Sequence, residues 1–122
     1  MTVPQRGEIY WLDFNPATGA EMRETHPALV IQNDVGNQAG ALTILAAITS
    51  NLRVARLPIG VIVEPEESGL PLTSVVHLGH LYTVDKTRLG RRAGQLSKAT
   101  MQRVDQAIAV SLGLRPFVLP EL

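Results

Sequence analysis

The hydrophobic pattern divides the chain into a row of short apolar segments followed by one amphipathic helix. Residues 42–49 are apolar at nearly every position, which is typical of a strand that is buried on both faces. The neighbouring segments are rich in β-favouring residues, and turn signals lie between them. We therefore expect strands at residues 7–14, 28–32, 42–49, 59–63 and 74–78, with 81–84 as a short continuation.

The connections between these segments carry turn residues rather than helical patterns. Asn33-Asp34 and Gly36-Asn37 predict a turn after the second segment, and residues 65–71 form an acidic connection before the fifth. Parallel strands need long crossover connections, so strands joined this closely are expected to pair antiparallel. The pattern predicts a mostly-β fold, a strongly bent sheet or small barrel of about five antiparallel strands with a C-terminal helix.

The region after Ser97 carries the clearest helical periodicity. Ser97 is suited to cap the start of a helix and Gly113 to end it. Between them, apolar side chains recur at helical spacing and are expected to pack on the sheet: Met101, Val104, Ile108 and Leu112. An apolar tail, residues 116–119, follows the helix. Such a tail either packs back on its own domain or serves a partner chain.

Length and composition indicate one globular domain spanning residues 1–122. A chain of 122 residues can bury a single hydrophobic core, and 45% apolar with 18% charged residues is ordinary for a globular protein. The absence of cysteines excludes disulfides and a thiolate nucleophile, and it favours the cytoplasm. The longest mostly apolar stretch, residues 41–48, is too short to span a membrane.

Charged residues narrow the candidate chemistry further. Eleven basic and eleven acidic residues cancel, so the chain lacks the overall charge of a strong duplex-DNA binder. Most charged residues in the segment from Lys86 to Arg103 are basic. They form either a solvated face or a patch that binds along the phosphates of a nucleic acid. The three histidines, His26, His77 and His80, form no obvious ligand set with a carboxylate, so no metal or cofactor is expected.

About a dozen short motifs occur in the order and spacing found in MazF/PemK toxins, and they extend from about residue 6 to residue 114. Examples are RGEIYW at residues 6–11, PALVI at 27–31, AAITS at 46–50, GLP at 69–71, TVDK at 83–86 and RLG at 88–90. The chain therefore resembles the MazF/PemK family over almost its whole length.

The resemblance implies an SH3-like barrel with a C-terminal helix, the fold shared by CcdB and PemK toxins, assembled as a symmetric homodimer. It also implies a cytoplasmic toxin of a type II toxin–antitoxin system that cuts single-stranded RNA without a metal or cofactor. The expected products are a 2′,3′-cyclic phosphate and a 5′-hydroxyl. A MazE-like antitoxin is expected to block such a toxin by laying a disordered segment across the dimer groove.

The resemblance also points to the reacting residues. Thr49 matches the family's catalytic threonine, and its hydroxyl, like that of Ser50, can donate to a phosphate oxygen. The family's second residue is an arginine before the proline that opens the second strand, and this chain has His26 there.

Three explanations fit this departure. An imidazole can both accept and donate a proton, so His26 can take the acid/base role itself. Alternatively, Arg23 supplies the positive charge on the phosphate, or the site is weakened. We favour His26 and Thr49 as the reacting pair with Arg23 as the phosphate partner. Glu21 fits the same motif and either orients Arg23 or binds RNA.

Further positions match the groove in which the family binds RNA: Gly19, Glu21, Ser50, Leu57, Pro58, His80, Leu81 and Thr83. The chain departs from the family at Gly79-His80, where members often carry Glu-Gln, and at Tyr82, where they often carry an arginine. Such side chains read base edges, so the family's preferred RNA sequences do not carry over. Trp11 and Tyr82 can each stack on a base or serve the core.

Two other functions remain compatible with these residues. CcdB toxins resemble MazF in fold but inhibit gyrase through protein contact, and they use the end of the C-terminal helix. Thr49 and the motif before Pro27 favour the nuclease, whereas His26 in the arginine's place keeps a binding toxin open. A degenerate toxin that is retained for antitoxin binding would share the motifs without the chemistry.

Overall fold

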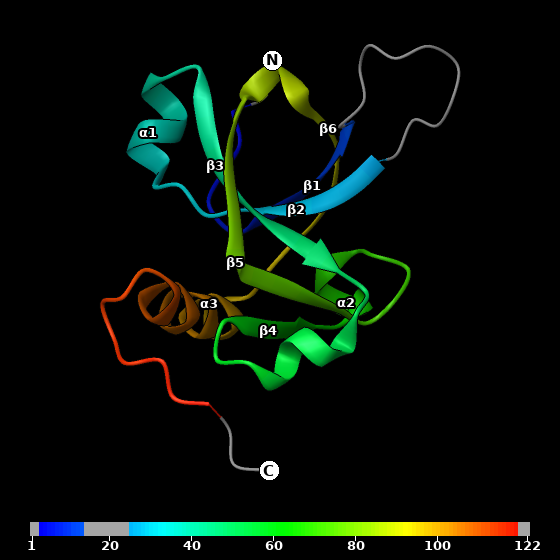
Figure 1. Cartoon of the computed structure of the whole chain (residues 1–122). Coiled ribbons are helices and arrows are strands. Elements are labelled where there is room, and N and C mark those ends of the chain that lie inside the picture. The colour runs from blue at the N-terminus through cyan, green and yellow to red at the C-terminus, as the bar shows by residue number, and fades with distance from the viewer. Residues whose placement is uncertain (1–2, 14–24, 120–122) are drawn as a thin grey trace.

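Six antiparallel strands form one curved sheet in the part of the chain that the computed structural model describes, residues 3–13 and 25–119 (Figure 1). Their order across the sheet is β4-β5-β3-β2-β1-β6. The strands are β1 (Glu8–Asp13), β2 (Thr25–Val30), β3 (Leu42–Thr49), β4 (Gly60–Val63), β5 (Ser74–Asp85) and β6 (Leu89–Gln95). The helices are α1 (Asp34–Ala39), α2 (Pro65–Ser68) and α3 (Lys98–Ser111), with 3-10 turns at η1 (Leu52–Arg56) and η2 (Lys86–Arg88).

This architecture confirms the predicted fold class, a mostly-β fold of antiparallel strands with a C-terminal helix. Strand β3 has the predicted bounds, and the segments predicted at 74–78 and 81–84 are two parts of β5. Strand β2 begins at Thr25 rather than at residue 28, because its first residues pair with the end of β1.

Three elements do not show in the sequence pattern: α1, α2 and β6. Residues 34–39 form a helix rather than only a turn, because the Asn33 side chain caps it by accepting a hydrogen bond from Gly36 N. The acidic connection holds the short helix α2, which begins at Pro65. Strand β6 pairs with β1 at the sheet edge and exposes Gly90, Arg91 and Arg92, so it lacks an apolar alternation.

The sheet bends at the middle of β5. Ala46 of β3 pairs with Leu81, whereas the next residue, Ala47, pairs with His77, so residues 78–80 bulge out of the ladder. Within the bulge, Gly79 N donates to His77 Nδ1 at 3.1 Å. Bulges bend a strand and redirect its side chains. The first half of β5 can therefore pair with β4 while the second half continues along β3.

Two apolar clusters pack on opposite faces of the central strands. Successive side chains of a strand point to opposite faces, so Ile9, Leu29 and Ala46 enter one cluster while their neighbours enter the other. The larger cluster also contains residues of β4, β5 and α3: Val61, Val63, Val76, Leu78, Val104 and Ala107. Both clusters take residues from β3, which confirms that this strand is buried on both faces.

Helix α3 packs against β4 and β5, as its apolar stripe predicts. The Ser97 side chain caps it by accepting a hydrogen bond from Thr100 N at 3.2 Å. Val104 and Ala107 are buried on the packed face, but Leu112 is exposed, so the predicted stripe is wrong at its last position. No helix in the described residues is long and apolar enough to cross a membrane.

A buried polar cluster anchors α1 to the sheet. The fully buried Asn37 accepts from Thr43 Oγ1 at 2.7 Å and donates from Nδ2 to Gln32 O at 3.0 Å. The backbone oxygen of Asn37 accepts from Lys86 Nζ. Buried polar groups are stable only when they are hydrogen-bonded, so these contacts explain why a short helix without an apolar stripe is held in place.

Replacement of Gly69 by alanine is expected to destabilise the fold more than replacement of Gly113. Both glycines have positive φ, so alanine costs about 1–2 kcal/mol at either position. A Cβ on Gly69 would lie 1.7 Å from the backbone oxygen of Ala93, whereas a Cβ on Gly113 meets no described atom within 4 Å. We expect Gly69→Ala to lose about 1–3 kcal/mol more than Gly113→Ala in urea unfolding. Equal losses would contradict the close approach of α2 to β6.

Candidate active site

His26 and Thr49 lie at the same end of the central strand pair, β2 and β3. The strands are antiparallel with Ala28 opposite Ala47, so continuing this register by two residues brings His26 opposite Thr49. Each is also paired on its other side, His26 with β1 and Thr49 with β5. Backbone pairing with β1 and β5 thus holds in place each of the two residues that the sequence predicts to react.

Two cavities adjoin this pair. The first, here the Trp11 cavity, has a volume of about 340 Å³ and is further lined by Trp11, Ser50, Leu70, Pro71, Leu72 and Ser74. The second, the Tyr82 cavity, has a volume of about 570 Å³ and is further lined by Ala47, His80 and Tyr82. Both cavities are lined by His26, Pro27, Ile48 and Thr49. The structure therefore brings His26 and Thr49 together where two hollows meet.

The turn after β3 orients the Thr49 hydroxyl. Thr49 Oγ1 accepts a hydrogen bond from Asn51 N at 3.1 Å, and the Asn51 side chain accepts from Arg53 N to cap η1. A hydroxyl has one proton and two lone pairs, and this contact uses only a lone pair. The proton of Thr49 therefore stays available for a phosphate oxygen. Ser50 lies beside it and is exposed.

Aromatic rings line the Tyr82 cavity. The His80 and Tyr82 rings lie 5.7 Å apart in a tilted arrangement, and His77 meets His80 edge-on at 6.2 Å. Burial raises the pKa of Tyr82 to about 12, so its hydroxyl stays protonated near neutral pH. The two departures from the family pattern, His80 and Tyr82, thus share one cavity wall. No group of three or more His, Cys, Asp or Glu in the described residues could hold a metal ion.

The arginines of η2 and β6 lie in two environments. Arg92 Nε forms an ion pair with Glu8 Oε2 at 2.9 Å. Arg88 and Arg91 instead line a hollow of about 550 Å³ that also contains Trp11 and Thr25, and we call it the basic hollow. Because Trp11 lines the Trp11 cavity as well, the basic hollow adjoins the candidate site. Part of the basic segment is therefore structural and part lies near the site.

Other predicted RNA-binding residues lie away from the reacting pair. Pro58 lines a groove beside α3 rather than either cavity, and Leu57 is half-buried at the end of η1. Leu81 packs against the larger core cluster. Thr83 is exposed further along β5, and it lines neither cavity. Gly19, Glu21 and Arg23 lie outside the described residues.

The sequence did not single out the residues that the connection before β5 contributes to the Trp11 cavity. Pro71 and Leu72 come from the connection between α2 and β5, where Pro71 ends the GLP motif at residues 69–71 and Leu72 follows it. Trp11, weighed as a stacking residue, lies between the Trp11 cavity and the basic hollow. Its indole Nε1 is buried and has no hydrogen-bond partner within the described part of the chain.

Comparison with known proteins shows to which family the chain belongs. The profile of the PemK-like, MazF-like toxins of type II toxin–antitoxin systems matches residues 5–112. The chain belongs to the MazF/PemK toxin family. Its relatives include endoribonuclease EndoA of Bacillus subtilis strain 168, 37% identical over 94% of this chain and 99% of the relative. Endoribonuclease MazF of Staphylococcus epidermidis is 38% identical over 93% of this chain and 94% of the relative.

Solved structures show the same MazF/PemK fold. An endoribonuclease from a mycobacterial species, solved in complex with its cognate antitoxin, matches with a TM-score of 0.77 at 28% identity over 92% of this chain and 97% of that one. A MazE–MazF complex from Deinococcus radiodurans matches with a TM-score of 0.75 at 24% identity, over 94% of this chain and 100% of that one, and it supports the fold alone.

The two tyrosines of this MazF/PemK toxin are expected to make its stability fall at alkaline pH. Burial and the bond from Tyr10 Oη to Glu8 raise the pKa of Tyr10 to about 12, and burial does the same for Tyr82. Their unfolded value is about 10, so the folded state holds these protons more tightly. The stabilisation is complete below pH about 10 and is lost as pH rises toward about 12.

Urea unfolding on both sides of that range measures this loss. Tyr82→Phe removes one of the two groups, so its stability should fall less steeply with pH than that of the unsubstituted protein. The near-ultraviolet absorbance of tyrosinate gives the titration directly. Absorbance that develops fully at the ordinary tyrosine pKa would contradict the burial of both hydroxyls.

Proposed function

We propose that this chain is the toxin of a type II toxin–antitoxin system and cleaves single-stranded RNA without a metal, with His26 and Thr49 as the reacting pair. Family membership and relatives named endoribonucleases support the RNA-cleaving activity. The observation that carries the choice of residues is that His26 and Thr49 line both cavities at the ends of β2 and β3.

Cleavage without a metal requires a base, an acid and groups that stabilise the charged phosphorane. The ribose 2′-hydroxyl loses its proton and its oxygen bonds to phosphorus, while the bond from phosphorus to O5′ breaks and O5′ takes a proton. The products are a 2′,3′-cyclic phosphate and a 5′-hydroxyl. The His26 imidazole can accept the first proton or donate the second, and it lies where the family pattern has an arginine.

Hydrogen bonds and positive charge would hold the scissile phosphate. The Thr49 hydroxyl can donate to a non-bridging oxygen, since its own contact with Asn51 uses only a lone pair. Ser50 adds a second hydroxyl at the mouth of the Trp11 cavity. Arg23 is the proposed cationic partner of the phosphate. Arg88 and Arg91 can follow the RNA backbone beyond Trp11.

The two cavities suggest where the neighbouring nucleotides lie. A strand whose phosphate sits between His26 and Thr49 places one nucleotide toward the Trp11 cavity and another toward the Tyr82 cavity. Stacking on an aromatic ring stabilises a bound base by about 1–3 kcal/mol. Trp11 and the His80–Tyr82 pair provide such rings. The remaining proposed RNA contacts come from the family resemblance: Gly19, Glu21, Leu57, Pro58, Leu81 and Thr83.

The proposed partners follow from the same family. We propose a homodimer in the cytoplasm that a MazE-like antitoxin neutralises. A mycobacterial relative solved with its cognate antitoxin supports the second point. The antitoxin would act by occupying the surface that binds RNA.

Thr49→Ala is expected to abolish detectable cleavage of a long single-stranded RNA in the presence of a chelator. Loss of one donor to the phosphorane lowers the rate by about 10²–10³-fold, while Thr49→Ser keeps the hydroxyl and should retain most activity. Gel analysis of the fragments and of their cyclic phosphate ends measures both. Cleavage that persists undiminished in Thr49→Ala would sink the assignment of Thr49.

His26→Arg tests what the histidine does, because it restores the family residue. If His26 transfers protons, the arginine variant cuts more slowly, by about 10²–10⁴-fold, since a guanidinium does not readily give up a proton. A variant that cuts faster than the unsubstituted protein would identify a weakened toxin. Intact RNA with both proteins would instead favour a toxin that acts by binding, as CcdB does.

A further inference from the structure

The bulge of β5 is anchored in the core on one side only. Figure 1 shows β5 turning at its middle, where its pairing with β3 is interrupted at residues 78–80. Leu78 is fully buried in the larger core cluster, and its backbone N donates to Ile59 O at 2.8 Å. Gly79 and His80 are exposed. The outer half of the bulge therefore has no buried side chain of its own to hold it.

The ring of His77 holds this outer half instead. Its Nδ1 accepts a hydrogen bond from Gly79 N at 3.1 Å. The two residues are also packed closely, because a Cβ on Gly79 would lie 2.9 Å from His77 Cε1 and 2.7 Å from Ile59 Cδ1. The backbone of Gly79 thus rests against the imidazole, and the position of the ring sets the position of the bulge.

The bulge connects His77 to the candidate site. His80 follows Gly79 directly and lines the Tyr82 cavity together with His26 and Tyr82. The His80 ring lies 6.2 Å from the His77 ring and 5.7 Å from the Tyr82 ring. His77 itself lines neither the Trp11 cavity nor the Tyr82 cavity. Its route to the cavity wall therefore runs through His80.

The hydrogen bond defines the protonation state that His77 needs. A backbone N–H can donate only to a ring nitrogen without a proton, so the neutral ring carries its proton on Nε2. A protonated ring has a proton on both nitrogens and would present a second donor to Gly79 N–H. Histidine is the side chain whose charge ordinarily changes between about pH 5 and pH 8. Mild acid thus turns an attractive contact into a repulsive one.

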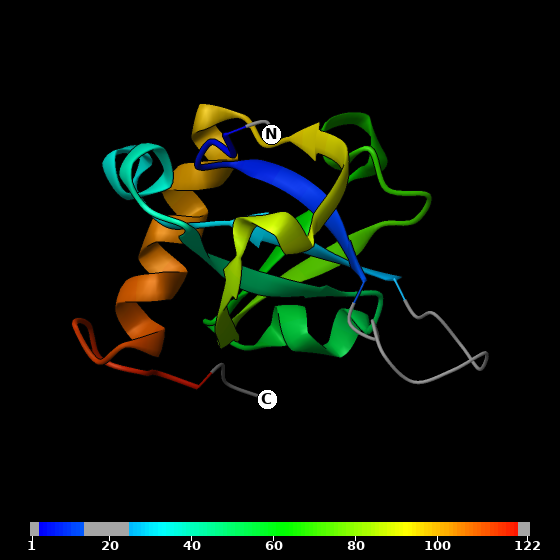
Figure 2. The same ribbon diagram turned by 90° about the horizontal axis from the view of Figure 1, so that it is seen from above.

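The elements packed against β5 give His77 no acidic partner. The residues opposite it are Ala47 on β3 and Gly60 on β4, and His77 forms no ion pair within the described part of the chain. Helix α3 and η1 also pack against β5, and they lie apart in Figures 1 and 2. Asp105 of α3 is paired with Arg6.

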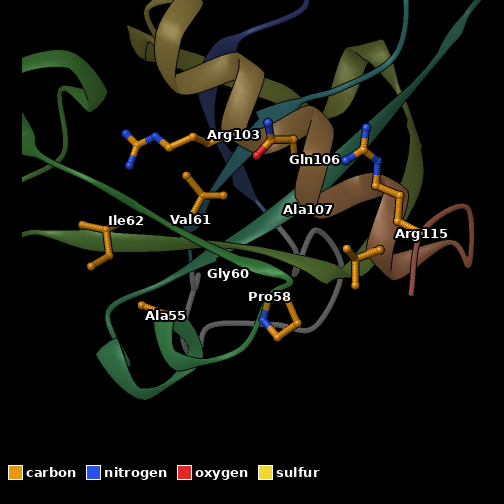
Figure 3. Close-up of a pocket in the computed structure, with 10 residues that line it drawn as sticks. Ala55, Pro58, Gly60, Val61, Ile62, Arg103, Gln106, Ala107 and Arg115 are labelled. Carbon is orange, nitrogen blue, oxygen red and sulfur yellow. The ribbon is translucent and has the colours of Figure 1, made fainter. Parts of the chain in front are cut away.

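The remaining charged side chains near β4 and β5 are basic. Those of η1 are Arg53 and Arg56, and the groove beside α3, which Gly60 also lines, holds Arg103 and Arg115 (Figure 3). The other titratable group close to the His77 ring is His80. A proton on His77 would therefore add positive charge without gaining a carboxylate to offset it.

We propose that His77 is a positioning residue for RNA binding in the Tyr82 cavity. Its neutral ring holds the bulge that presents His80 to the bound nucleotide, and protonation of the ring releases the bulge and weakens binding. The inference rests on the proposed placement of RNA at this site. It goes further because it makes that binding depend on pH through a residue that does not touch the RNA.

NMR spectra of the free protein test the hydrogen bond without RNA. Long-range proton–nitrogen spectra should show the neutral His77 ring with its proton on Nε2, and the Gly79 amide signal should follow the titration of His77. His77→Asn places an amide oxygen where Nδ1 lies, so its Gly79 signal should stay nearly constant. A neutral ring that carries its proton on Nδ1 would overturn the proposal.

Binding of an RNA that cannot be cut measures the effect on the site. The probe is an oligonucleotide that spans a mapped cleavage site and has 2′-deoxyribose at the attacking position. His77→Phe keeps a ring but removes the acceptor, so its Kd at about pH 8 should rise roughly 3- to 10-fold, the usual effect of one hydrogen bond. His77→Asn keeps the acceptor and should bind as tightly as the unsubstituted protein.

The pH profile separates positioning from a merely structural role. Between about pH 8 and about pH 5.5, the Kd of the unsubstituted protein divided by that of His77→Asn should rise roughly 3- to 10-fold. Titration of His26 and His80 is common to both proteins and cancels in this ratio. A ratio that stays constant would overturn the proposal, because protonation of His77 would then not affect binding.

A double-mutant cycle with His80→Ala tests the route. His77→Phe should weaken binding when His80 is present but by less than about 2-fold when it is absent, and kcat at saturating RNA should stay unchanged. Equal weakening in both backgrounds would overturn the route through His80. Urea unfolding checks that His77→Phe is folded. If it is not, the NMR titration and the His77→Asn profile decide.

Failure of the proposed function gives a different result from failure of this inference. A protein that neither cuts nor binds RNA would overturn both. A protein that binds and cuts RNA equally well with phenylalanine or histidine at position 77 would overturn the positioning role alone.

Discussion

The burial of β3 on both faces is the constraint on which the rest of the structure depends. Alternate residues of this strand enter the two core clusters, so a shift of one residue would exchange its faces and disrupt both clusters. Apolar packing therefore fixes its register with β2 and β5 as firmly as the backbone hydrogen bonds do. Because Thr49 ends this strand and His26 lies opposite, the core itself positions the candidate reacting pair.

Elements that fill the core with their own side chains were predictable, whereas elements held by their neighbours were not. Strand β3 is apolar at six of its eight positions, and its predicted bounds are correct. Helix α1 instead depends on the Asn33 cap and on the burial of Asn37, and β6 depends on pairing with β1. Leu112 was predicted to pack on the sheet but is exposed. Helical spacing identifies the apolar face of a helix, but it does not show at which residue the sheet stops covering that face.

The family motifs could name His26 and Thr49, but they could not describe the cavities around them. The Trp11 cavity combines residues of β1, β2 and β3 with the connection before β5, and its shape depends on the curvature of the sheet. Irregularities in the ladders bend the strands, both at residues 78–80 and in the pairing of β1 with β6, and no local hydrophobic pattern encodes them. Pro58 matched the same family groove as His80, yet it lines the groove beside α3 instead.

Histidine at position 26 changes how the charge of a bound phosphate can be balanced. A guanidinium carries a permanent positive charge, whereas an imidazole gains proton exchange and makes its charge depend on pH. Tyr82 does not replace the missing charge, because its raised pKa keeps the phenol neutral. Among the described residues that line the cavities and the basic hollow, the fixed charges are Arg88 and Arg91, which lie beyond Trp11. The proposed function therefore divides the fixed charge between Arg23 at the phosphate and Arg88 and Arg91 along a strand beyond Trp11, and it assigns proton transfer to His26.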